Sequence, residues 1–310
     1  MKDHRILIVG SSNTDMVIKT KTFPAPGETI LGGRFLMNAG GKGANQAVAA
    51  ARLGGLVTFV GKIGDDLFGK QAVQQLKDEG INVDFMSVDS EHPSGVALIT
   101  VDSKGENSIV VAPGSNGTLN AEDFDKAMEM LSESAFVLMQ LEIPLPTVEY
   151  IAQLAAMKQK KVILNPAPAA KLSDQLLRNL YMITPNETEA ELLTGIRVND
   201  EFSALKAAAI LHEKGVEIVI ITMGSAGAFV LANGTSQIIR AEKVEAVDTT
   251  AAGDTFNGAL VVALSEGKTI QESIAFANKA AAISVTRIGA QSSVPFRKEM
   301  SSESPKPNNR

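Results

Sequence analysis

The stretch DTTAAGDTFNGA places one acid, Asp254, directly after three small residues and ahead of an apolar segment. Ala251, Ala252 and Gly253 have almost nothing to pack, so they suit a position where backbone N–H groups must come close to a ligand. The apolar residues that follow recur at roughly helical spacing until Gly267, which is typical of a helix C-terminus. We therefore expect Asp254 in the first turn of a helix, where the helix dipole and the free amides favour anions, phosphate included. A plain capping role is the simplest alternative for an acid at this position.

A second stretch, NAGGKGANQAVAAARLGG, is rich in glycine at its start and then becomes helical. Such a loop lets the backbone approach a small polar ligand, and Lys42 and Asn45 supply side-chain donors beside it. It is not a Walker loop, because Leu36 stands where the first glycine is required and no Ser or Thr follows Lys42. It does not fit the dinucleotide fingerprint either, because Gln46 occupies the third glycine position. We interpret the stretch as a ligand loop, with a merely tight start to a helix as the alternative.

Polar residues that follow predicted strands can reach the same ligand. Asn13 and Asp15 come just after the first apolar run, and Glu142 follows a later one. Amide and carboxylate groups at such positions can bind sugar hydroxyls in a bidentate way. The pattern around Asn13 and Asp15 is weak by itself, and an ordinary turn is its alternative interpretation.

Two further segments suit a nucleotide and its metal ion. In TPNETEAELLTG, Asn186 and Glu189 stand three residues apart at a helix start, so their side chains can face one side. Glu189 is well spaced to organise magnesium-bound water near phosphates, because Mg²⁺ prefers oxygen ligands and keeps several waters. Capping the helix is the alternative role for Asn186, and the two roles are compatible. The glycine-rich turn in TMGSAGAF (residues 222–229) suits phosphates or a ribose, or is a plain hairpin turn.

Composition excludes several kinds of site. The chain contains no cysteine, which rules out disulfides, thiolate zinc sites and cysteine nucleophiles. The three histidines, His4, His92 and His212, are far apart, so we expect neither a histidine metal site nor a Ser–His–Asp triad. The formal net charge of -6 argues against a nucleic-acid partner. No apolar run approaches the roughly 20 residues of a membrane span, and the first is too short for a signal peptide, so we expect a cytoplasmic protein with no membrane partner.

Short apolar runs alternate with longer helical patterns along most of the chain. The predicted strands are RILIVG, VTFVG, AFVLMQ, KVILN, YMIT and EIVIIT, near-continuous apolar runs typical of a buried parallel sheet. Between them lie helical patterns such as GANQAVAAARLG, FGKQAVQQLKDEG, PTVEYIAQLAAMKQ and EFSALKAAAILHEKG. This alternation predicts an α/β fold, a doubly wound, mostly parallel sheet sandwiched by helices. Functional residues in such folds gather at the carboxyl ends of the strands.

Two regions depart from this alternation. Residues 27–41 and 95–114 alternate polar and apolar residues like half-exposed strands, and a turn signal, DSKGE, divides the second. We expect them to form a small β-sheet lid over the ends of the main sheet, with lid strands from about 14–40 and 95–113. An antiparallel extension of the main sheet's edge is the alternative. A lid suits a kinase, because water competes with the acceptor hydroxyl.

The domain organisation is expected to be simple. The chain has 310 residues and 45% hydrophobic content, enough to bury a large core. We expect a single α/β domain over residues 1–300, which includes the lid. The last ten residues, SSESPKPNNR (301–310), are polar and contain Pro, so we expect a disordered tail there.

With GGKGAN, PNETEAE, TMGSAG and AAGDTFNGA in this order, the sequence resembles the ribokinase-like carbohydrate kinases. The resemblance covers about residues 5–296, and its set of motifs is highly specific. Many members have Gly where this chain has Ala251 or Ala252, whereas the AAGD form, NPAPA and VTRIGAQSSVP point to the members that phosphorylate ribose. The resemblance implies a doubly wound α/β domain with a small β lid, and a homodimer formed through that lid. It also implies ATP-dependent phosphorylation of D-ribose at its 5-hydroxyl, giving D-ribose 5-phosphate and ADP.

The same resemblance implies a role for each matching residue. Asp254 matches the general base that activates the sugar's primary hydroxyl, and the amides of Ala251, Ala252, Gly253 and Asp254 match an anion hole for the transferred phosphoryl group. The ribose contacts are matched by Asn13, Asp15, Gly41, Lys42, Gly43, Asn45, Glu142 and Asp254. The positions around ATP are matched by Asn186, Glu189, Thr222, Gly224, Ser225, Gly227, Gly253 and Asn278.

Two kinds of cation are implied as well. Mg²⁺ accompanies ATP, and Glu189 belongs to the magnesium and phosphate motif, acting through water. A monovalent cation, usually K⁺, activates members of the family. Its site is matched by Asp248, Thr250, Ser284, Arg287, Gly289 and Ser293, several of them through backbone carbonyls. Side-chain identity therefore matters little at this site, apart from Asp248.

Three other functions compete with this one. A related kinase for 2-deoxyribose, fructose or a nucleoside is the nearest, because one or two hydroxyl contacts in a pocket can decide the preference. A non-catalytic sugar or nucleotide sensor with the same fold is more distant, since such a protein is expected to lose the base or the anion-hole glycine, and this chain has both. An NAD-binding protein is the most distant of the three, because the chain lacks its glycine fingerprint.

Overall fold

The computed structural model describes residues 5–301, so the tail expected over 301–310 lies, apart from Ser301, outside the described residues. Its largest element is an eight-stranded sheet with the strand order β14-β13-β12-β11-β10-β9-β1-β4. The strands from β12 to β4 are parallel, and β13 and β14 continue the sheet as an antiparallel edge. The strands span Arg5–Val9 (β1), Leu56–Val60 (β4), Phe136–Met139 (β9), Lys161–Leu164 (β10), Met182–Ile183 (β11), Ile218–Thr222 (β12), Ala228–Ala232 (β13) and Thr235–Ile239 (β14).

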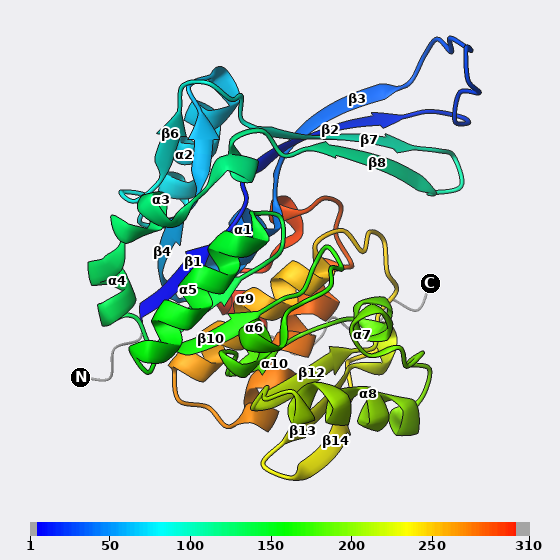
Figure 1. Ribbon diagram of the computed structural model, residues 1–310. Helices are drawn as coiled ribbons and strands as arrows, with labels where there is room; N and C mark the ends of the chain where they lie inside the picture. Colours follow the sequence, from blue (N-terminus) through cyan, green and yellow to red (C-terminus); the bar gives the residue numbers. More distant parts are fainter. Residues whose placement is uncertain (1–4, 302–310) are drawn as a thin grey trace.

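Helices cover both faces of this sheet (Figure 1). One face carries α1 (Lys42–Arg52), α2 (Leu67–Asp78), α9 (Ala252–Ser265) and α10 (Ile270–Ser284). The other carries α3 (Ala121–Asp125), α4 (Met128–Glu133), α5 (Leu145–Met157), α6 (Asp174–Arg178), α7 (Glu187–Thr194) and α8 (Glu201–Glu213). Alternate strand residues face opposite sides, so in β1 Ile6 and Ile8 pack with the first set and Leu7 and Val9 with the second. The predicted doubly wound α/β architecture is thereby confirmed.

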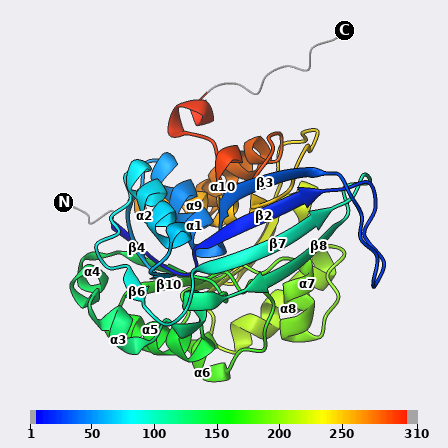
Figure 2. The same ribbon diagram turned by 90° about the horizontal axis from the view of Figure 1, so that it is seen from above.

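A second, smaller sheet stands apart from the main one (Figure 2). Its strand order is β3-β2-β7-β8, built from Asn13–Lys19 (β2), Arg34–Gly40 (β3), Gly95–Val101 (β7) and Asn107–Ala112 (β8). The separate sheet agrees with the expected lid strands, and the alternative of an edge extension is wrong. Because β2 closely follows β1 and β3 runs directly into α1, the base of this sheet adjoins the glycine-rich loop.

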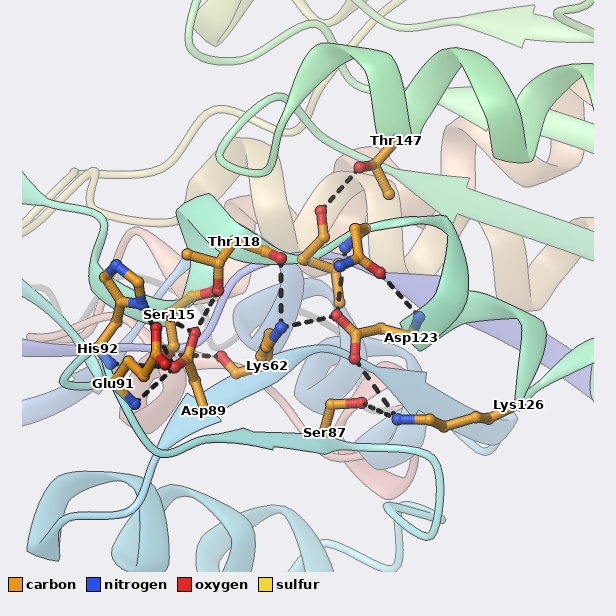
Figure 3. Close-up of polar contacts among 12 residues, drawn as sticks. Lys62, Ser87, Asp89, Glu91, His92, Ser115, Thr118, Asp123, Lys126 and Thr147 are labelled. Atoms are coloured by element: carbon orange, nitrogen blue, oxygen red, sulfur yellow. Dashed lines mark hydrogen bonds and ion pairs between the residues drawn. The ribbon is translucent and has the colours of Figure 1, made fainter.

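Polar side chains fasten the connection that follows β8 (Figure 3). The short helix η1 (Gly114–Thr118) lies beside a two-stranded sheet of β5 (Lys62–Gly64) and β6 (Ser87–Asp89). Lys62 Nζ donates to Asp123 Oδ2 (2.9 Å) and to the Thr118 carbonyl (3.3 Å). Thr118 Oγ1 in turn donates to Asp89 Oδ2 (2.6 Å). These contacts hold η1 in place, so that the side chain of its residue Asn116 can reach Ser12 and Asn13 at the start of β2.

The element predictions hold where periodicity is strong. All six predicted strands are present, and the five helical patterns correspond to α1, α2, α5, α8 and α9. The turn after β12 (η2, Gly224–Ala226) joins two antiparallel strands, so TMGSAGAF is a hairpin turn, and its nucleotide role stays a prediction. The antiparallel β14, the β5–β6 pair and α10 were not anticipated. Within residues 5–301, no helix has both the length and the apolar character that crossing a bilayer requires.

Helices α1 and α9 approach each other at a glycine. A Cβ added to Gly258 of α9 would lie 2.5 Å from Ala49 Cβ and 2.7 Å from the Gln46 carbonyl oxygen on α1. Only glycine therefore permits this backbone contact. The close approach matters because α9 carries Asp254 and α1 follows the glycine-rich loop.

We expect Gly258→Ala to lower the free energy of unfolding by about 1–3 kcal/mol, because the added methyl group overpacks the two helices. This outcome opposes the helix propensity of alanine, which favours Ala over Gly by about 1 kcal/mol. Gly117→Ala is the matched control, since Gly117 is exposed and its added Cβ would meet only Pro113 at 3.5 Å. Urea titrations of both variants measure the difference, and equal stability in the two would contradict the packing argument.

Candidate active site

The segment before α9 forms a tight turn. Ala251 adopts the left-handed conformation (φ 58°, ψ 17°), which is uncommon for a residue with a Cβ. The left-handed conformation is a physical reason why many members of the family that the sequence resembles have Gly at this point. A Cβ on Gly253 would meet nothing within 4 Å, so the first turn of α9 is open on that side. The Ala252 N–H donates to the Thr249 carbonyl (3.2 Å), which leaves the amides of Gly253 and Asp254 as the better candidates for an anion hole.

Asp254 lies in the first turn of α9, as predicted, but the alternative of a plain capping role is wrong. The helix start has no side-chain cap; the Asp254 carboxylate instead accepts hydrogen bonds from Asn45 Nδ2 and Gln46 Nε2, both at 2.9 Å. The side chain is buried, and its burial raises its pKa above the ordinary range of an aspartate. The Lys42 ammonium and the two amide donors oppose that rise.

The glycine-rich loop packs tightly on the end of β1. Gly41 has φ 87°, and a Cβ on it would lie 2.7 Å from the Asn13 amide nitrogen. A Cβ on Gly43 would lie 2.7 Å from the backbone of Gly10. Glu142 closes the loop from the other side, because one of its oxygens accepts from the Lys42 N–H (2.9 Å) and from Ser11 Oγ (2.6 Å). The loop is therefore preorganised by backbone contacts.

Acidic groups gather around the Lys42 side chain. Burial by itself lowers the pKa of Lys42, but the carboxylates of Asp254, Glu142, Glu189 and Asp15 outweigh it, and the net shift is upward. The pKa of Asp15 is raised to about 7, first by burial and then by the charges of Glu142 and Asp254. Asp15 lies against Gly40, where an added Cβ would lie 2.2 Å from both carboxylate oxygens. The Lys42 ammonium group, with several carboxylates around it, is suited to binding an uncharged polyol and an anion side by side.

Asn13 is buried at the first residue of β2, beside the loop. Its Oδ1 accepts a hydrogen bond from Asn116 Nδ2 (2.8 Å). Asn116 belongs to η1, and it also accepts from the Ser12 N–H (2.9 Å). The sequence argument missed Asn116, because its Asn-Gly-Thr triplet reads as a glycosylation signal or a turn. The contact between η1 and the start of β2 brings Asn116 to the site.

Asn186 and Glu189 form the capping box of α7. Asn186 Oδ1 accepts from the Glu189 N–H (2.8 Å), and Glu189 Oε2 accepts from the Asn186 N–H (2.9 Å). The capping role predicted for Asn186 is thus confirmed, and it coexists with a position on the wall of a cavity. Burial raises the pKa of Glu189, while the Asn186 amide and Lys42 oppose the shift.

The cavity, of about 190 Å³, joins several predicted residues at the carboxyl ends of the strands. Its lining combines the turn before α9 and its first residues, the start of α7, the end of β12 and the Lys42 side chain. The lining residues are Lys42, Asn165, Ala167, Thr184, Asn186, Glu189, Thr222, Thr249, Ala251, Ala252, Gly253, Asp254 and Asn257. Asp254, the residues predicted to form the anion hole and part of the predicted nucleotide set thus share one space.

Other predicted residues lie outside this lining. Gly224, Ser225 and Gly227 continue the chain from Thr222 through the η2 turn, where both glycines have positive φ. Asn278, on α10, donates its Nδ2 to the Ile239 carbonyl (2.8 Å) and so fastens the end of β14. The sugar-side residues are grouped separately around the glycine-rich loop: Asn13, Asp15, Gly41, Gly43, Asn45 and Glu142.

The residues expected to hold a monovalent cation come together from two segments. Asp248 Oδ1 accepts from the Thr250 N–H (3.0 Å) and Oδ2 from the Gly289 N–H (2.9 Å). Burial raises the pKa of Asp248, but these hydrogen bonds outweigh it and hold the pKa below the ordinary range. Ser284 and Ser293 bond their hydroxyls to nearby carbonyls, and Arg287 pairs with Glu299 (2.5 Å). Of these residues, Asp248 offers an ionised carboxylate, a donor that fits a monovalent cation.

Sequence reasoning missed a group of amide and hydroxyl side chains behind and beside Asp254. Asn165, Thr184 and Asn257 line the cavity, and Gln46 contacts the Asp254 carboxylate directly. Asn165 and Asn257 stand in NPAPA and DTFNGA, which marked the resemblance without suggesting a role for either residue. Gln46 was noted only as the residue that spoils a dinucleotide fingerprint. Among residues 5–301, no group of three or more His, Cys, Asp or Glu side chains is arranged to hold a metal ion.

Comparison with known proteins agrees with this geometry. Residues 3–297 match the pfkB family of carbohydrate kinases. The chain is 50% identical to the ribokinase of Haemophilus influenzae over 294 residues, which make up 95% of this chain and 96% of that protein. It is 38% identical to the deoxyribokinase of Salmonella typhimurium over 292 residues, 94% of this chain and 95% of that protein.

A solved structure shares the whole fold. Arabidopsis thaliana ribokinase, in complex with ribose and ATP, superposes with a TM-score of 0.91 at 34% identity, covering 97% of this chain and 98% of that one. The fold, the family match and the identity to curated relatives lead to one conclusion. The chain belongs to the pfkB family of carbohydrate kinases, and within it is a phosphotransferase of the ribokinase type.

Proposed function

We propose that this chain transfers the γ-phosphoryl group of ATP to the 5-hydroxyl of D-ribose, giving D-ribose 5-phosphate and ADP. The observation that carries the proposal is the position of Asp254. It is a buried carboxylate in the first turn of α9, held by two side-chain amides, on the wall of a cavity shared with Lys42 and Asn186. The Arabidopsis ribokinase structure, which holds ribose and ATP, supports both substrates. Because the proposed reaction uses ATP, we propose that the protein acts in the cytoplasm.

The proposed mechanism depends on positioning and charge stabilisation, since phosphoryl transfer leaves little covalent work for the protein. Asp254 accepts the proton of the 5-hydroxyl as that oxygen bonds to the γ-phosphorus. The bond between this phosphorus and the bridging oxygen breaks, and ADP keeps the electron pair. The N–H groups of Gly253 and Asp254, with the dipole of α9, stabilise the charge on the phosphoryl oxygens. Ala251 and Ala252 complete the turn that presents these amides.

Two substrate regions follow from the same geometry. We place ribose among the residues around the glycine-rich loop, and ATP along the cavity toward α7 and the η2 turn. Lys42 lies where the two meet and stays ionised, because the surrounding carboxylates raise its pKa. The ribose contacts proposed are Asn13, Asp15, Gly41, Lys42, Gly43, Asn45, Glu142 and Asp254. The ATP contacts proposed are Asn186, Glu189, Thr222, Gly224, Ser225, Gly227, Gly253 and Asn278.

Two cations are part of the proposal. Glu189 offers a carboxylate on the cavity wall, a donor suited to the water shell of Mg²⁺. Mg²⁺ held there through water would supply positive charge that offsets the negative charge of the ATP phosphates. For K⁺ we propose the site of Asp248, Thr250, Ser284, Arg287, Gly289 and Ser293. The proposal is supported by the ionised carboxylate of Asp248, which accepts hydrogen bonds from the segment before α9 and from the segment after α10.

We propose that the small sheet is both a lid and a dimer surface within one domain over residues 1–300. All six residues of β8 are exposed, and so are the large apolar side chains of Phe35, Leu98 and Val110. Exposed apolar groups of this size are costly in water and suit pairing with a second copy of the chain. Closure of such a sheet would exclude water from the acceptor hydroxyl.

One alternative has support of its own. The 38% identity to a deoxyribokinase over nearly the whole chain keeps 2-deoxyribose open as the substrate. The two sugars differ by one hydroxyl, and a site that hydrogen-bonds that hydroxyl discriminates strongly against its absence. Fructose or a nucleoside, and a non-catalytic sensor, have no specific observation in their favour.

The first prediction from the proposed function concerns Asp254→Asn, which removes the base while keeping the size and shape of the side chain. We expect kcat to fall by about 10³-fold, within the range that general base catalysis contributes. A coupled ADP-release assay with ATP and Mg²⁺ measures it over ribose, 2-deoxyribose, fructose and adenosine. ATP binding by calorimetry is the control and should be unchanged. Normal turnover in this variant would remove Asp254 from the mechanism, whereas turnover of the unaltered protein on another sugar alone would overturn only the substrate.

The second prediction follows from the pKa of Asp15, which is raised to about 7. Below this pH the carboxyl holds a proton and accepts hydrogen bonds from ribose poorly. We expect the KM for ribose to fall as pH rises through about 7 and to level off above it. Asp15→Asn should have a higher KM that does not change over the same range, in steady-state kinetics with saturating ATP.

Protein stability gives an independent check on the same group. Between the ordinary pKa of 3.8 and about 7, the folded state holds a proton that the unfolded state lacks, so stability falls as pH rises through this window. Asp15→Asn removes the effect and should raise the Tm at pH 8 relative to the unaltered protein, but not at pH 4. The same difference in Tm at both pH values would refute the assigned pKa.

The third prediction concerns the monovalent cation. Asp248→Asn keeps the shape of the side chain but removes its charge, and we expect the K⁺ concentration for half-maximal stimulation to rise about tenfold, which corresponds to about 1.4 kcal/mol. Choline chloride at equal ionic strength separates a specific effect from screening. Unchanged stimulation by K⁺ in Asp248→Asn would move the cation elsewhere.

A further inference from the structure

Buried side-chain amides lie behind Asp254, on the side away from the cavity. Gln46 and Gln140 are both 0% exposed, and neither belongs to the lining of the cavity. Gln46 is on α1, and Gln140 is the residue directly after the last residue of β9. Polar groups are costly to bury unless they are hydrogen-bonded. Their presence next to a catalytic base calls for a specific role.

Both the nitrogen and the oxygen of the Gln46 side-chain amide form hydrogen bonds. Its Nε2 donates to Asp254 Oδ1 (2.9 Å) and to Asn165 Oδ1 (3.0 Å), which uses both of its N–H groups. Its Oε1 accepts from Gln140 Nε2 (2.5 Å). The reverse orientation of the amide would set its oxygen against the two acceptor oxygens of Asp254 and Asn165. Gln46 is therefore held in one orientation, with its donors toward the base.

The hydrogen bonds continue from Asn165 to the start of α9. Asn165 Nδ2 donates to the Thr184 carbonyl (3.2 Å), and Thr184 Oγ1 donates to Asn257 Oδ1 (2.7 Å). Asn257 Nδ2 then donates to the Gly253 carbonyl (2.8 Å). One buried chain thus runs from the carboxylate of the base to the carbonyl of the residue before it. The side chain of the base and the backbone of the anion hole are fixed by the same network.

The two oxygens of Asp254 are not equivalent. Oδ1 is bonded to Gln46, which is fully buried, whereas Oδ2 is bonded to Asn45, which we place among the ribose contacts. We propose that Gln46 is a positioning residue for the reaction: it holds Oδ1 from behind, so that Oδ2 is the oxygen that takes the proton of the sugar hydroxyl. The proposal deepens the proposed function and rests on it.

The surroundings of Asp254 make a hydrogen bond at Oδ1 important for its ionisation. Lys42 from the glycine-rich loop favours the charged form, whereas Glu142 beyond β9 disfavours it. The carboxylates of Asp15 on β2 and Glu189 on α7 also interact unfavourably with it. Burial acts in the same direction as these acids. Loss of the Gln46 donor therefore leaves the carboxylate less stabilised against protonation as well as less well oriented.

The test compares Gln46→Met with the unaltered protein. We expect kcat with ribose to fall about 10- to 100-fold, as for a reacting group displaced by about 1 Å. The KM values for ribose and ATP should stay nearly constant, because Gln46 is not itself among the lining residues of the cavity or the proposed ribose contacts and reaches them only through Asp254 and Asn165. The acid limb of the kcat profile should move up by about one pH unit, the effect of losing one hydrogen bond to a charged group. Gln46→Glu, which adds a like charge at the same place, should move the limb further in the same direction.

Thr147→Val is the matched control. It loses a buried hydrogen bond, from Thr147 Oγ1 to the Leu119 carbonyl (2.7 Å), on α5 and away from the site (Figure 3). It should lower the Tm without moving the pH profile. Calorimetric ATP binding confirms that each variant is folded.

Three results would overturn the proposal. The first is an unchanged kcat and pH profile in folded Gln46→Met. The second is a loss of activity in which KM rises and the acid limb stays in place, since this indicates a merely structural role. The third is an unaltered protein that turns over none of the sugars tested, which refutes the proposed function and this inference together. Turnover of another sugar with the expected shift in the variants would refute the substrate and support the role of Gln46.

Discussion

A carboxylate buried at the start of a helix is the constraint on which this structure depends. Asp254 must stay ionised to act as the base we propose, yet its burial favours protonation. The amides of Asn45 and Gln46, together with Lys42, offset that cost, and all three come from α1. Helix α1 therefore has to lie close to α9, and a glycine at their crossing makes the approach possible.

The glycine-rich loop and the turn before α9 solve related problems. In both places, the backbone adopts a conformation or an approach that few side chains permit. Gly41 and Gly43 let the loop lie on the end of β1. In the turn before α9, Ala251 adopts a left-handed conformation despite its Cβ. Strain of this kind is tolerated where the surrounding structure holds the residue in place, and it is common at functional sites.

Much of the fold could be predicted because its signals are local. The apolar runs of the six predicted strands and the helical spacing between them depend only on neighbours in the chain. The same is true of the capping box of Asn186 and Glu189 and of the first-turn position of Asp254. The antiparallel edge was missed because a short apolar strand after a glycine turn has the same pattern as a parallel one.

The sequence by itself determined the elements, their order, and the kinds of residue that stand at the strand ends. The tertiary structure alone decided which of these meet: Gln46 and Asp254 are 208 residues apart in the chain, and Asn13 and Asn116 are 103 apart. It also decided the ionisation of Asp15, whose pKa depends on burial and on charges from distant segments. The physical reason is the distance along the chain over which each effect acts. Backbone preferences depend on a few neighbouring residues, whereas desolvation and Coulomb interactions depend on packing in three dimensions.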